Sequence, residues 1–355
     1  MSQDKQTQVF YRKYRPQKFE EVIGQEHVVG ILKNALKEKR LAHAYLFSGP
    51  RGTGKTTIAR ILAHEAGSFE EDIIEIDAAS QRGIDEARAL REAVHILPLR
   101  SPYKVYIIDE VHMLTKEAFN ALLKTLEEPP KHTIFILATT ELAKVPDTVA
   151  SRTQRFEFTK IGLADIIKEL GIITKAEGIK AEDKALKLIA FFAEGSLRDA
   201  ENILFQASSL GEDTIKEKDV RMLLGAPMSE SINKLLTHAF ARPDDSVGRG
   251  KKVSELISAL DEILEEGTDP ALVLRLLLRN VRAVYFLALD PRTENMLSHE
   301  FSAEEIATLK AFSATPKTAE LALREIMEAS RIKIDDYAAA IPLELALIKI
   351  ATYEK

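Results

Sequence analysis

Hydrophobic and polar positions follow two different periods along roughly the first 160 residues. Short segments typical of strands, several of them continuous apolar runs, occur at residues 44–47, 72–76, 104–108, 133–138 and 155–158. Apolar residues spaced three and four apart, typical of helices, occur at residues 25–39, 55–66, 85–95 and 116–127. Because strands and helices alternate with short connections, the pattern predicts an α/β fold in which helices cover both faces of a parallel sheet.

The rest of the chain has a helical pattern, and the strand signals fade after residue 158. We expect an α/β domain at residues 1–162, a small helical domain at residues 163–226 and an all-helical domain at residues 227–355. The most apolar stretch, residues 271–289, carries Arg275, Arg279 and Arg282, which argues against a membrane span. These arginines fall on one stripe of a helix, and we interpret the stripe as a solvated face rather than a subunit contact.

A phosphate-binding loop is the strongest chemical signal. Residues 49–56, Gly-Pro-Arg-Gly-Thr-Gly-Lys-Thr, fit the pattern G-x-x-x-x-G-K-[ST] between a predicted strand and a predicted helix. Lys55 can reach the β- and γ-phosphates, and the Thr56 hydroxyl can bind Mg²⁺. The residues expected to cradle the nucleotide phosphates are Gly49, Arg51, Gly52, Thr53, Gly54, Lys55, Thr56 and Thr57.

Two carboxylates end the predicted strand at residues 104–108. Asp109 is placed to hold Mg²⁺, directly or through water, and Glu110 is placed to polarise a water molecule for attack on the γ-phosphate. Such a pair alone would be an ordinary solvated strand end. Together with the phosphate loop, it predicts hydrolysis of ATP or GTP.

Composition sets limits on the function. The net charge of −6 excludes a uniformly basic nucleic-acid coat, so any DNA contact must come from local patches. No cysteine is present, which excludes disulfides, thiolate zinc sites and cysteine nucleophiles. The polar start of the chain shows no signal peptide, and we expect a cytoplasmic protein without a membrane segment. His112 follows the carboxylate pair, and we interpret it as a packed or partly exposed histidine rather than a metal ligand.

The order of the motifs resembles that of AAA+ ATPases of the clamp-loader clade, and most of all the gamma/tau family of bacterial DNA polymerase III. The motifs that carry the resemblance are residues 11–16, 22–27, 43–49, 75–80, 108–114, 120–130, 138–140, 151–152 and 195–200. Similarity is strong over residues 9–210. The resemblance implies a AAA+ phosphate-loop domain, a helical lid and a helical collar.

The resemblance also implies roles for individual residues. Thr140 would be the sensor that reads the γ-phosphate, and Arg198 the second sensor, in the lid. Arg152 would be a finger that acts in trans on the ATP of a neighbouring subunit, where a planar guanidinium suits the spreading phosphoryl charge. The residues expected to line the adenine pocket are Tyr11, Arg15, Pro16, Val22, Ile23 and Leu197.

The same resemblance implies partners. We expect delta-type and delta-prime-type subunits in a hetero-pentamer, a sliding clamp and primed DNA. ATP binding would drive clamp opening and loading, and hydrolysis would release the clamp, whereas nucleotidyl transfer would belong only to the polymerase holoenzyme. The residues expected to contact DNA phosphates, near helix N-termini, are Ser80, Gln81, Arg82 and Lys116, with Arg82 the best candidate.

The sequence departs from the family pattern at two places, of which only the first changes an expectation. Only residues 65–71 occupy the place where relatives often carry a four-cysteine zinc module, so we expect no zinc. Thr153 follows the finger motif Ser151-Arg152, where cysteine is common. The chain ends after the expected collar, so we expect a gamma-like form without the tau extension.

Three alternatives stay open. A replication factor C-like small subunit is favoured by residues 82–85 and disfavoured by Val111-His112 and by the helix end at residues 126–130. A non-hydrolysing stator of a clamp loader would usually have a damaged phosphate loop. A AAA+ branch-migration motor would carry a winged-helix C-terminus instead of a long helical one.

Overall fold

The computed structural model describes residues 8–80, 83–210, 213–241, 249–312, 314–332 and 338–353. The chain forms two compact units. One comprises Met1–Ile173 with Phe192–Phe205, and the other comprises Thr174–Phe191 with Gln206–Lys355. Residues 163–226 are therefore shared between the two units, and the three-domain division stays a prediction.

The first unit is built on a five-stranded parallel sheet of order β2-β3-β4-β1-β5. The strands are β1 (Ala44–Ser48), β2 (Ile73–Asp77), β3 (Lys104–Asp109), β4 (Thr133–Thr139) and β5 (Gln154–Glu157). All five predicted strands are confirmed, nearly at the predicted bounds. The carboxyl ends of β1 and β3 meet the phosphate loop and the Asp109-Glu110 pair, so the order of strands brings both motifs to one edge.

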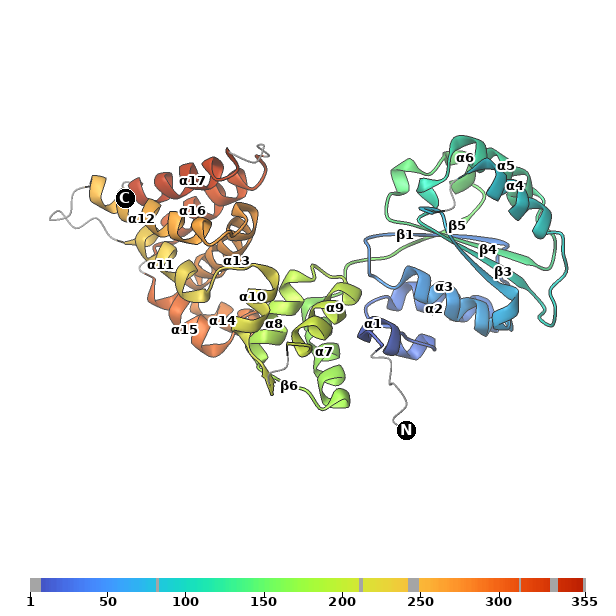
Figure 1. Cartoon of the computed structure of the whole chain (residues 1–355), viewed down its shortest axis with the longest axis horizontal. Helices are drawn as coiled ribbons and strands as arrows, with labels where there is room; N and C mark the ends of the chain where they lie inside the picture. Colours follow the sequence, from blue (N-terminus) through green and yellow to red (C-terminus); the bar gives the residue numbers. More distant parts are fainter. Residues whose placement is uncertain are drawn as a thin grey trace. The chain divides into compact units, whose positions relative to one another are not determined.

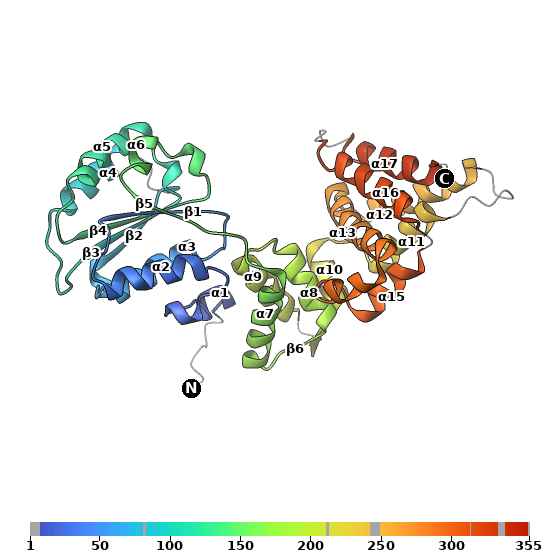
Figure 2. The same cartoon turned by 180° about the vertical axis from the view of Figure 1, so that it is seen from behind.

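Helices cover both faces of this sheet, as Figures 1 and 2 show. Helices α2 (Glu26–Lys37) and α3 (Lys55–Glu65) pack on the face that carries Tyr45 and Phe47. Helices α4 (Ile84–Ala93), α5 (Lys116–Glu127) and α6 (Asp147–Ala150) pack on the face that carries Leu46. Alternate side chains of β1, β3 and β4 thus enter two separate cores, which is why these three strands read as continuous apolar runs. The edge strands β2 and β5 carry exposed polar residues instead.

Shorter elements connect these layers. They are α1 (Phe10–Lys13), η1 (Phe19–Glu21), η2 (Glu70–Asp72), η3 (Val111–Met113) and η4 (Leu142–Lys144). The Thr115 hydroxyl caps α5 by accepting from the N–H of Ala118 at 3.2 Å. Pro129 and Pro130 follow Glu128, the C-cap residue of α5, and proline cannot continue a helix.

The remainder of the chain is mostly helical, as predicted. Its helices are α7 (Leu163–Glu177), α8 (Asp183–Phe192), α9 (Leu197–Ser208), α10 (Glu217–Leu224), α11 (Ser229–Phe240), α12 (Arg249–Glu265), α13 (Pro270–Leu289), η5 (Pro291–Thr293), α14 (Glu294–Leu297), α15 (Ala303–Ala311), α16 (Pro316–Ala329) and α17 (Ile341–Thr352). Two strands, β6 (Lys180–Ala181) and β7 (Thr214–Ile215), pair in parallel and were not predicted. A strand of two residues is too short to show a period.

The arginine stripe of α13 is not the solvated face that its spacing predicted. Arg279 is only 6% exposed, and its guanidinium lies 4.0 Å from the ring centroid of Phe301. Arg282 donates to both carboxylate oxygens of Glu300, at 3.0 and 2.9 Å. The solvated interpretation was wrong for Arg279, where aromatic faces supply the partners that water would otherwise provide, whereas the Arg282 side chain is still 41% exposed.

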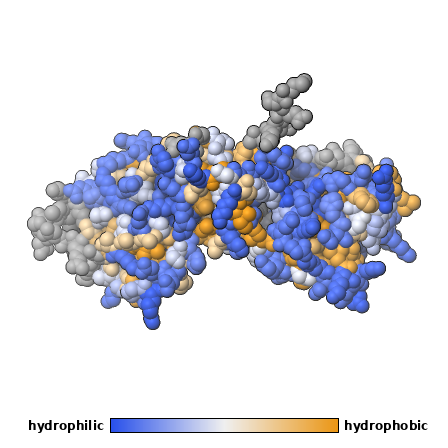
Figure 3. All heavy atoms as spheres, turned by 90° about the horizontal axis from the view of Figure 1, so that it is seen from below, coloured by the Kyte–Doolittle hydropathy of each residue, from blue (hydrophilic) through white to orange (hydrophobic). Residues whose placement is uncertain are grey.

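Hydrophilic side chains and smaller hydrophobic areas share the face drawn in Figure 3. In the part of the chain that the structure describes, no helix is long and apolar enough to cross a membrane.

Asp72 anchors the connection that leads into β3. Asp72 is 1% exposed, and its carboxylate accepts from the backbone N–H groups of Leu99, Arg100 and Ser101, at 2.7, 3.1 and 3.1 Å. Burial acts to raise the pKa of Asp72, but the Ser101 hydroxyl and these three N–H groups outweigh it and lower the pKa to about 2.

We expect Asp72→Ala to lower the free energy of unfolding by on the order of 3 kcal/mol, because it leaves buried N–H groups without an acceptor. Urea unfolding at pH 7 measures this loss. Since the pKa of Asp72 lies below its ordinary value of 3.8, the stabilisation is present above that pH and is lost as the pH falls toward 2. Asp72→Asn keeps one acceptor oxygen and should lose less; an equal loss would contradict the hydrogen-bond explanation.

Candidate active site

The phosphate loop between β1 and α3 requires glycine for steric reasons. Gly52 has a φ of 71°, and a Cβ atom there would lie 1.9 Å from the Ser196 hydroxyl oxygen. Gly49 has a φ of 145°, and its Cβ atom would lie 2.3 Å from the backbone oxygen of Phe158. The Gly52 carbonyl also accepts from the N–H of Leu197 at 3.2 Å, so the loop is fastened to the start of α9.

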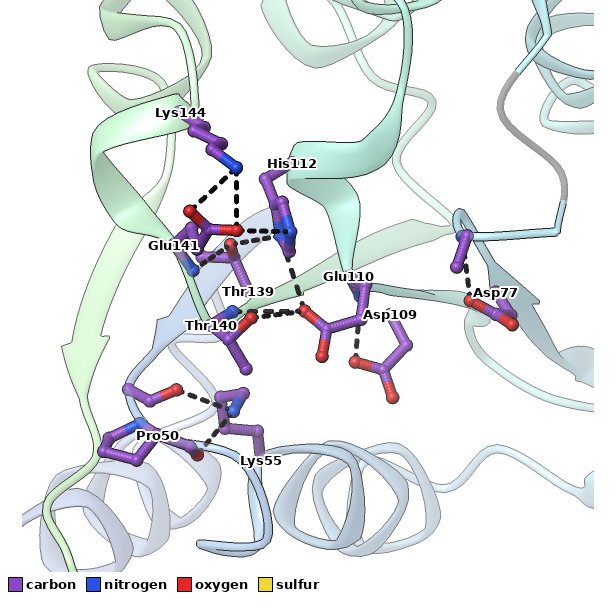
Figure 4. Close-up of polar contacts among 12 residues, drawn as sticks. Pro50, Lys55, Asp77, Asp109, Glu110, His112, Thr139, Thr140, Glu141 and Lys144 are labelled. Atoms are coloured by element: carbon purple, nitrogen blue, oxygen red, sulfur yellow. Dashed lines mark hydrogen bonds and ion pairs between the residues drawn. The ribbon is translucent and has the colours of Figure 1, made fainter. Parts of the chain in front are cut away.

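Lys55 lies folded over this loop, as Figure 4 shows. It is 6% exposed, and its ammonium donates to the carbonyls of Gly49 and Pro50, both at 2.8 Å. Burial lowers the pKa of Lys55, and the nearby carboxylates of Glu110 and Asp109 act in the opposite direction. The ammonium is thus held by two neutral acceptors, at the first residue of α3.

Thr56 and Asp109 come together across the gap between α3 and β3. The Thr56 hydroxyl donates to Oδ2 of Asp109 at 2.8 Å, and Oδ1 accepts from the backbone N–H of Glu110 at 2.9 Å. A hydroxyl and a carboxylate are the oxygen ligands that Mg²⁺ takes in nucleotide sites. The donor set therefore fits a magnesium ion.

Glu110 has a left-handed backbone, with a φ of 46°. This conformation is uncommon for a residue with a side chain, and such strain often concentrates at functional sites. Its Oε2 accepts from both the hydroxyl and the backbone N–H of Thr140, at 2.9 and 3.2 Å (Figure 4). The turn thus directs the carboxylate toward the end of β4, where the predicted sensor lies.

A cavity of about 580 Å³ lies within the first unit and joins these groups. Six of its lining residues are those predicted for the adenine pocket, namely Tyr11, Arg15, Pro16, Val22, Ile23 and Leu197. The loop residues that line it are Arg51, Gly52, Thr53, Gly54, Lys55, Thr56 and Thr57, and Asp109 and Glu110 line it as well. The structure therefore brings together most of the residues that the sequence assigned separately to phosphate, metal and base, whereas Gly49 and the predicted sensor Thr140 do not line this cavity.

Sequence reasoning missed several residues of this cavity. These are Arg12, Glu75, Asp77, Ala79, Ile161 and Glu201. Glu75 lies in the strand predicted at residues 72–76, and Asp77 directly follows it. Arg12 lies within the motif at residues 11–16, so the positions next to the predicted site residues were a usable signal. Glu201 had no such signal, because an acidic residue in a lid helix is usually solvated.

The two predicted arginines occupy different places. Arg198 lines the cavity, and its guanidinium lies 4.7 Å from the ring centroid of Tyr11. Arg152 is not among the residues that line the cavity in its own chain. Its guanidinium pairs with the Glu127 carboxylate at 2.6 Å and donates to the Thr148 carbonyl at 2.7 Å. Its trans role stays a prediction.

The predicted DNA contacts are only partly within the described residues. Ser80 and Lys116 are exposed, in the turn after β2 and at the first residue of α5. Both lie at the carboxyl-end edge of the sheet, since β2 and β3 are parallel neighbours. Gln81 and Arg82 lie outside the described residues.

Glu201 is a buried acid in the wall of the cavity, with 6% exposure. Burial first, and the charge of Glu169 second, raise the pKa of Glu201 to about 8 from an ordinary value of 4.5. Between these two values the folded state binds more protons than the unfolded state. The stability of the protein should therefore fall as the pH rises through this window.

We expect Glu201→Gln to remove this penalty and to raise the free energy of unfolding by about 1–3 kcal/mol at pH 8.5, where the wild-type carboxyl would be charged and buried. The gain should vanish near pH 4.5. Urea unfolding across the pH range measures it, with the exposed Glu65→Gln as the matched control. A gain that does not depend on pH would contradict the assignment.

Sequence comparisons with known proteins find subunits of DNA polymerase III. A family profile described as "DNA polymerase III, delta subunit" matches residues 24–79 and 65–162, and one described as "DNA polymerase III clamp loader subunit, ATPase lid domain" matches residues 165–213. The gamma subunit of DNA polymerase III from Buchnera aphidicola subsp. Acyrthosiphon pisum is 40% identical over 277 residues, which cover 72% of this chain and 75% of that protein. The chain belongs to the gamma/tau family of DNA polymerase III subunits.

A second member of the gamma/tau family matches over a longer part of the chain. The tau subunit of Bacillus subtilis is 43% identical over 311 residues, which cover 82% of this chain and 54% of that protein. The chain therefore spans about half the length of this relative. The predicted resemblance to the gamma/tau family is confirmed.

A solved structure supports the fold. The Thermotoga maritima RuvB Holliday junction branch migration motor matches with a TM-score of 0.50 and 23% identity, over 68% of this chain and 85% of that one. At this identity the likeness shows the fold alone. The predicted AAA+ fold of this gamma/tau family member, with a phosphate-loop domain, a lid and further helices, is confirmed.

Proposed function

We propose that this chain is an ATPase motor subunit of the DNA polymerase III clamp loader. ATP binding would drive opening of the sliding clamp and its loading on primed DNA, and hydrolysis would release it. One observation carries the proposal: Lys55, Thr56, Asp109 and Glu110 line a single cavity that the predicted adenine-binding residues complete. Membership of the gamma/tau family supports the wider role.

The chemistry of each group supports hydrolysis. Lys55 would exchange the Gly49 and Pro50 carbonyls for phosphate oxygens, which are better acceptors for an ammonium. Thr56 and Asp109 would hold Mg²⁺, which neutralises phosphate charge when bound. Glu110 would take a proton from the attacking water, and Thr140, which now donates to this carboxylate, would then be available to the γ-phosphate.

The remaining assignments concern the assembly. Arg198 would act within the chain as the second sensor, and Arg152 would act on the nucleotide of a neighbouring subunit. Ser80, Gln81, Arg82 and Lys116 would contact DNA phosphates without reading sequence, which suits a protein that loads clamps anywhere. We propose delta-type and delta-prime-type subunits in a hetero-pentamer as partners, and the cytoplasm as the location.

Steady-state ATP turnover tests the proposal. The purified chain is assayed alone, and then with its delta-type and delta-prime-type partners, the clamp and primed DNA added in turn. Stimulation that needs all of them supports a clamp-loader motor. Activity that ignores clamp and partners would instead indicate another AAA+ motor. No turnover in any mixture, with ATP still bound, would indicate a stator.

A further inference from the structure

His112 connects the proposed catalytic carboxylate to the surface of the domain. It lies in η3, directly after the strained turn at Glu110, and its side chain is 6% exposed. Its Nδ1 atom lies 3.0 Å from Oγ1 of Thr139 and 3.4 Å from Oε2 of Glu110. Its Nε2 atom lies 3.4 Å from Oε1 of Glu141. Both ring nitrogens therefore face oxygen atoms.

The chain of contacts continues outward from the ring. Glu141 pairs with Lys144 at 2.9 Å, and these two side chains are 47% and 59% exposed. The backbone N–H of Glu141 donates to Oγ1 of Thr139 at 3.0 Å, which fixes the hydroxyl that His112 also contacts. Figure 4 shows the line of side chains from Lys144 through Glu141 and His112 to Glu110.

Thr140 and His112 meet the same oxygen of Glu110, Oε2. In Figure 4 the second carboxylate oxygen points away from both of them. A carboxylate held at one oxygen keeps the other for a water molecule, and its orientation then depends on the groups that hold the first. The tautomer with the proton on Nδ1 places an N–H group 3.0 Å from its hydrogen-bond partner, Oγ1 of Thr139, and 3.4 Å from Oε2 of Glu110, which can only accept when ionised.

We propose that His112 is a positioning residue for Glu110. Its Nδ1 atom contacts the Glu110 carboxylate and orients it, and its Nε2 atom contacts Glu141, which pairs with Lys144. The inference rests on the proposed ATPase function. His112 does not line the nucleotide cavity, so it acts on the carboxylate and not on the nucleotide. Small errors in the position of a catalytic group lower the rate of the chemical step and leave ground-state binding intact.

The test separates the two ring nitrogens with a matched pair of variants. In His112→Asn the side-chain amide can replace Nδ1, so that the donor to Glu110 is kept. In His112→Gln the longer side chain places its amide near the Nε2 position, so that the contact with Glu141 is kept instead. His112→Ala removes both. We measure kcat and KM for ATP in the full assembly with clamp and primed DNA, nucleotide affinity of each chain, and thermal unfolding.

We expect His112→Ala to lower kcat by about tenfold to a hundredfold, with KM and nucleotide affinity changed by less than about twofold. His112→Asn should recover most of kcat, and His112→Gln should not. A normal kcat in His112→Ala would overturn the proposal. So would a loss of nucleotide affinity or stability that follows kcat across all three variants, because it would show that the histidine only supports the fold.

Failure of the ATPase proposal can be distinguished from failure of the inference about His112. If the wild-type assembly binds ATP but shows no turnover, the ATPase proposal fails. The inference about His112 then falls with it, since it concerns the position of a base for hydrolysis. If the wild type turns over ATP and only the pattern among the three variants differs from the expected one, the ATPase proposal stands and the inference alone is wrong.

Discussion

Arg152→Ala is expected to lower ATP turnover of the assembled complex by about a thousandfold or more, the range found for fingers supplied to a neighbouring site. Nucleotide affinity of the isolated chain should stay unchanged, because Arg152 does not line the cavity of its own chain. The guanidinium instead pairs with Glu127, and the Arg152 side chain is 36% exposed, so a neighbouring subunit could bind it at the cost of one surface ion pair. Steady-state turnover and nucleotide titration measure the two quantities.

Arg152→Lys is the matched control, because it keeps the charge and removes the planar, two-pronged donor. A mixed assembly gives a sharper test. Chains with Lys55→Ala keep the finger and lack a working site, whereas chains with Arg152→Ala keep the site and lack the finger. If the finger acts in trans, mixing them should restore part of the turnover that neither has alone. Normal turnover in a pure Arg152→Ala assembly would rule out the trans role.

Lys55→Ala is expected to abolish measurable turnover, with a loss of at least about a hundredfold, and to weaken ATP binding as well. Lys55 is the first residue of α3 and places a positive charge beside the phosphate loop. It is buried, so water cannot take over the role of its ammonium group. Turnover and binding of a fluorescent ATP analogue measure the effect. The exposed Lys37→Ala in α2 serves as the control for loss of a positive charge. Tight binding with normal turnover in Lys55→Ala would refute the assignment of the loop.

The fold of the first unit could be predicted from the sequence because each of its strands and helices is marked by a pattern within its own short segment. A run such as residues 133–138 is buried on both faces, and the amphipathic helix at residues 116–127 has a capping threonine and a proline pair at its ends. Burial of Arg279 could not be predicted in this way, because Phe301, which covers it, approaches only through tertiary packing. Spacing along α13 determines which residues share a face and not what packs on that face.

The candidate site shows the same division. The phosphate loop and the Asp109-Glu110 pair are contiguous motifs, so their chemistry could be inferred before the fold was known. Glu201 belongs to the same cavity only because α9 comes against the loop, and the contact of His112 with Glu110 depends on a backbone turn of unusual φ. Such arrangements depend on dihedral angles and packing, which composition and periodicity do not encode.

The close approach of Gly52 to Ser196 makes two positions far apart in the sequence into one steric unit. A side chain at residue 52 would occupy the space of the Ser196 hydroxyl, and a larger residue at 196, which is 6% exposed, would press on the loop in turn. If both positions are randomised in a library, we expect the variants that fold to combine glycine at position 52 with a small residue at position 196. The phosphate loop therefore limits which residues can occupy position 196, just before α9, although the two segments are far apart in the sequence.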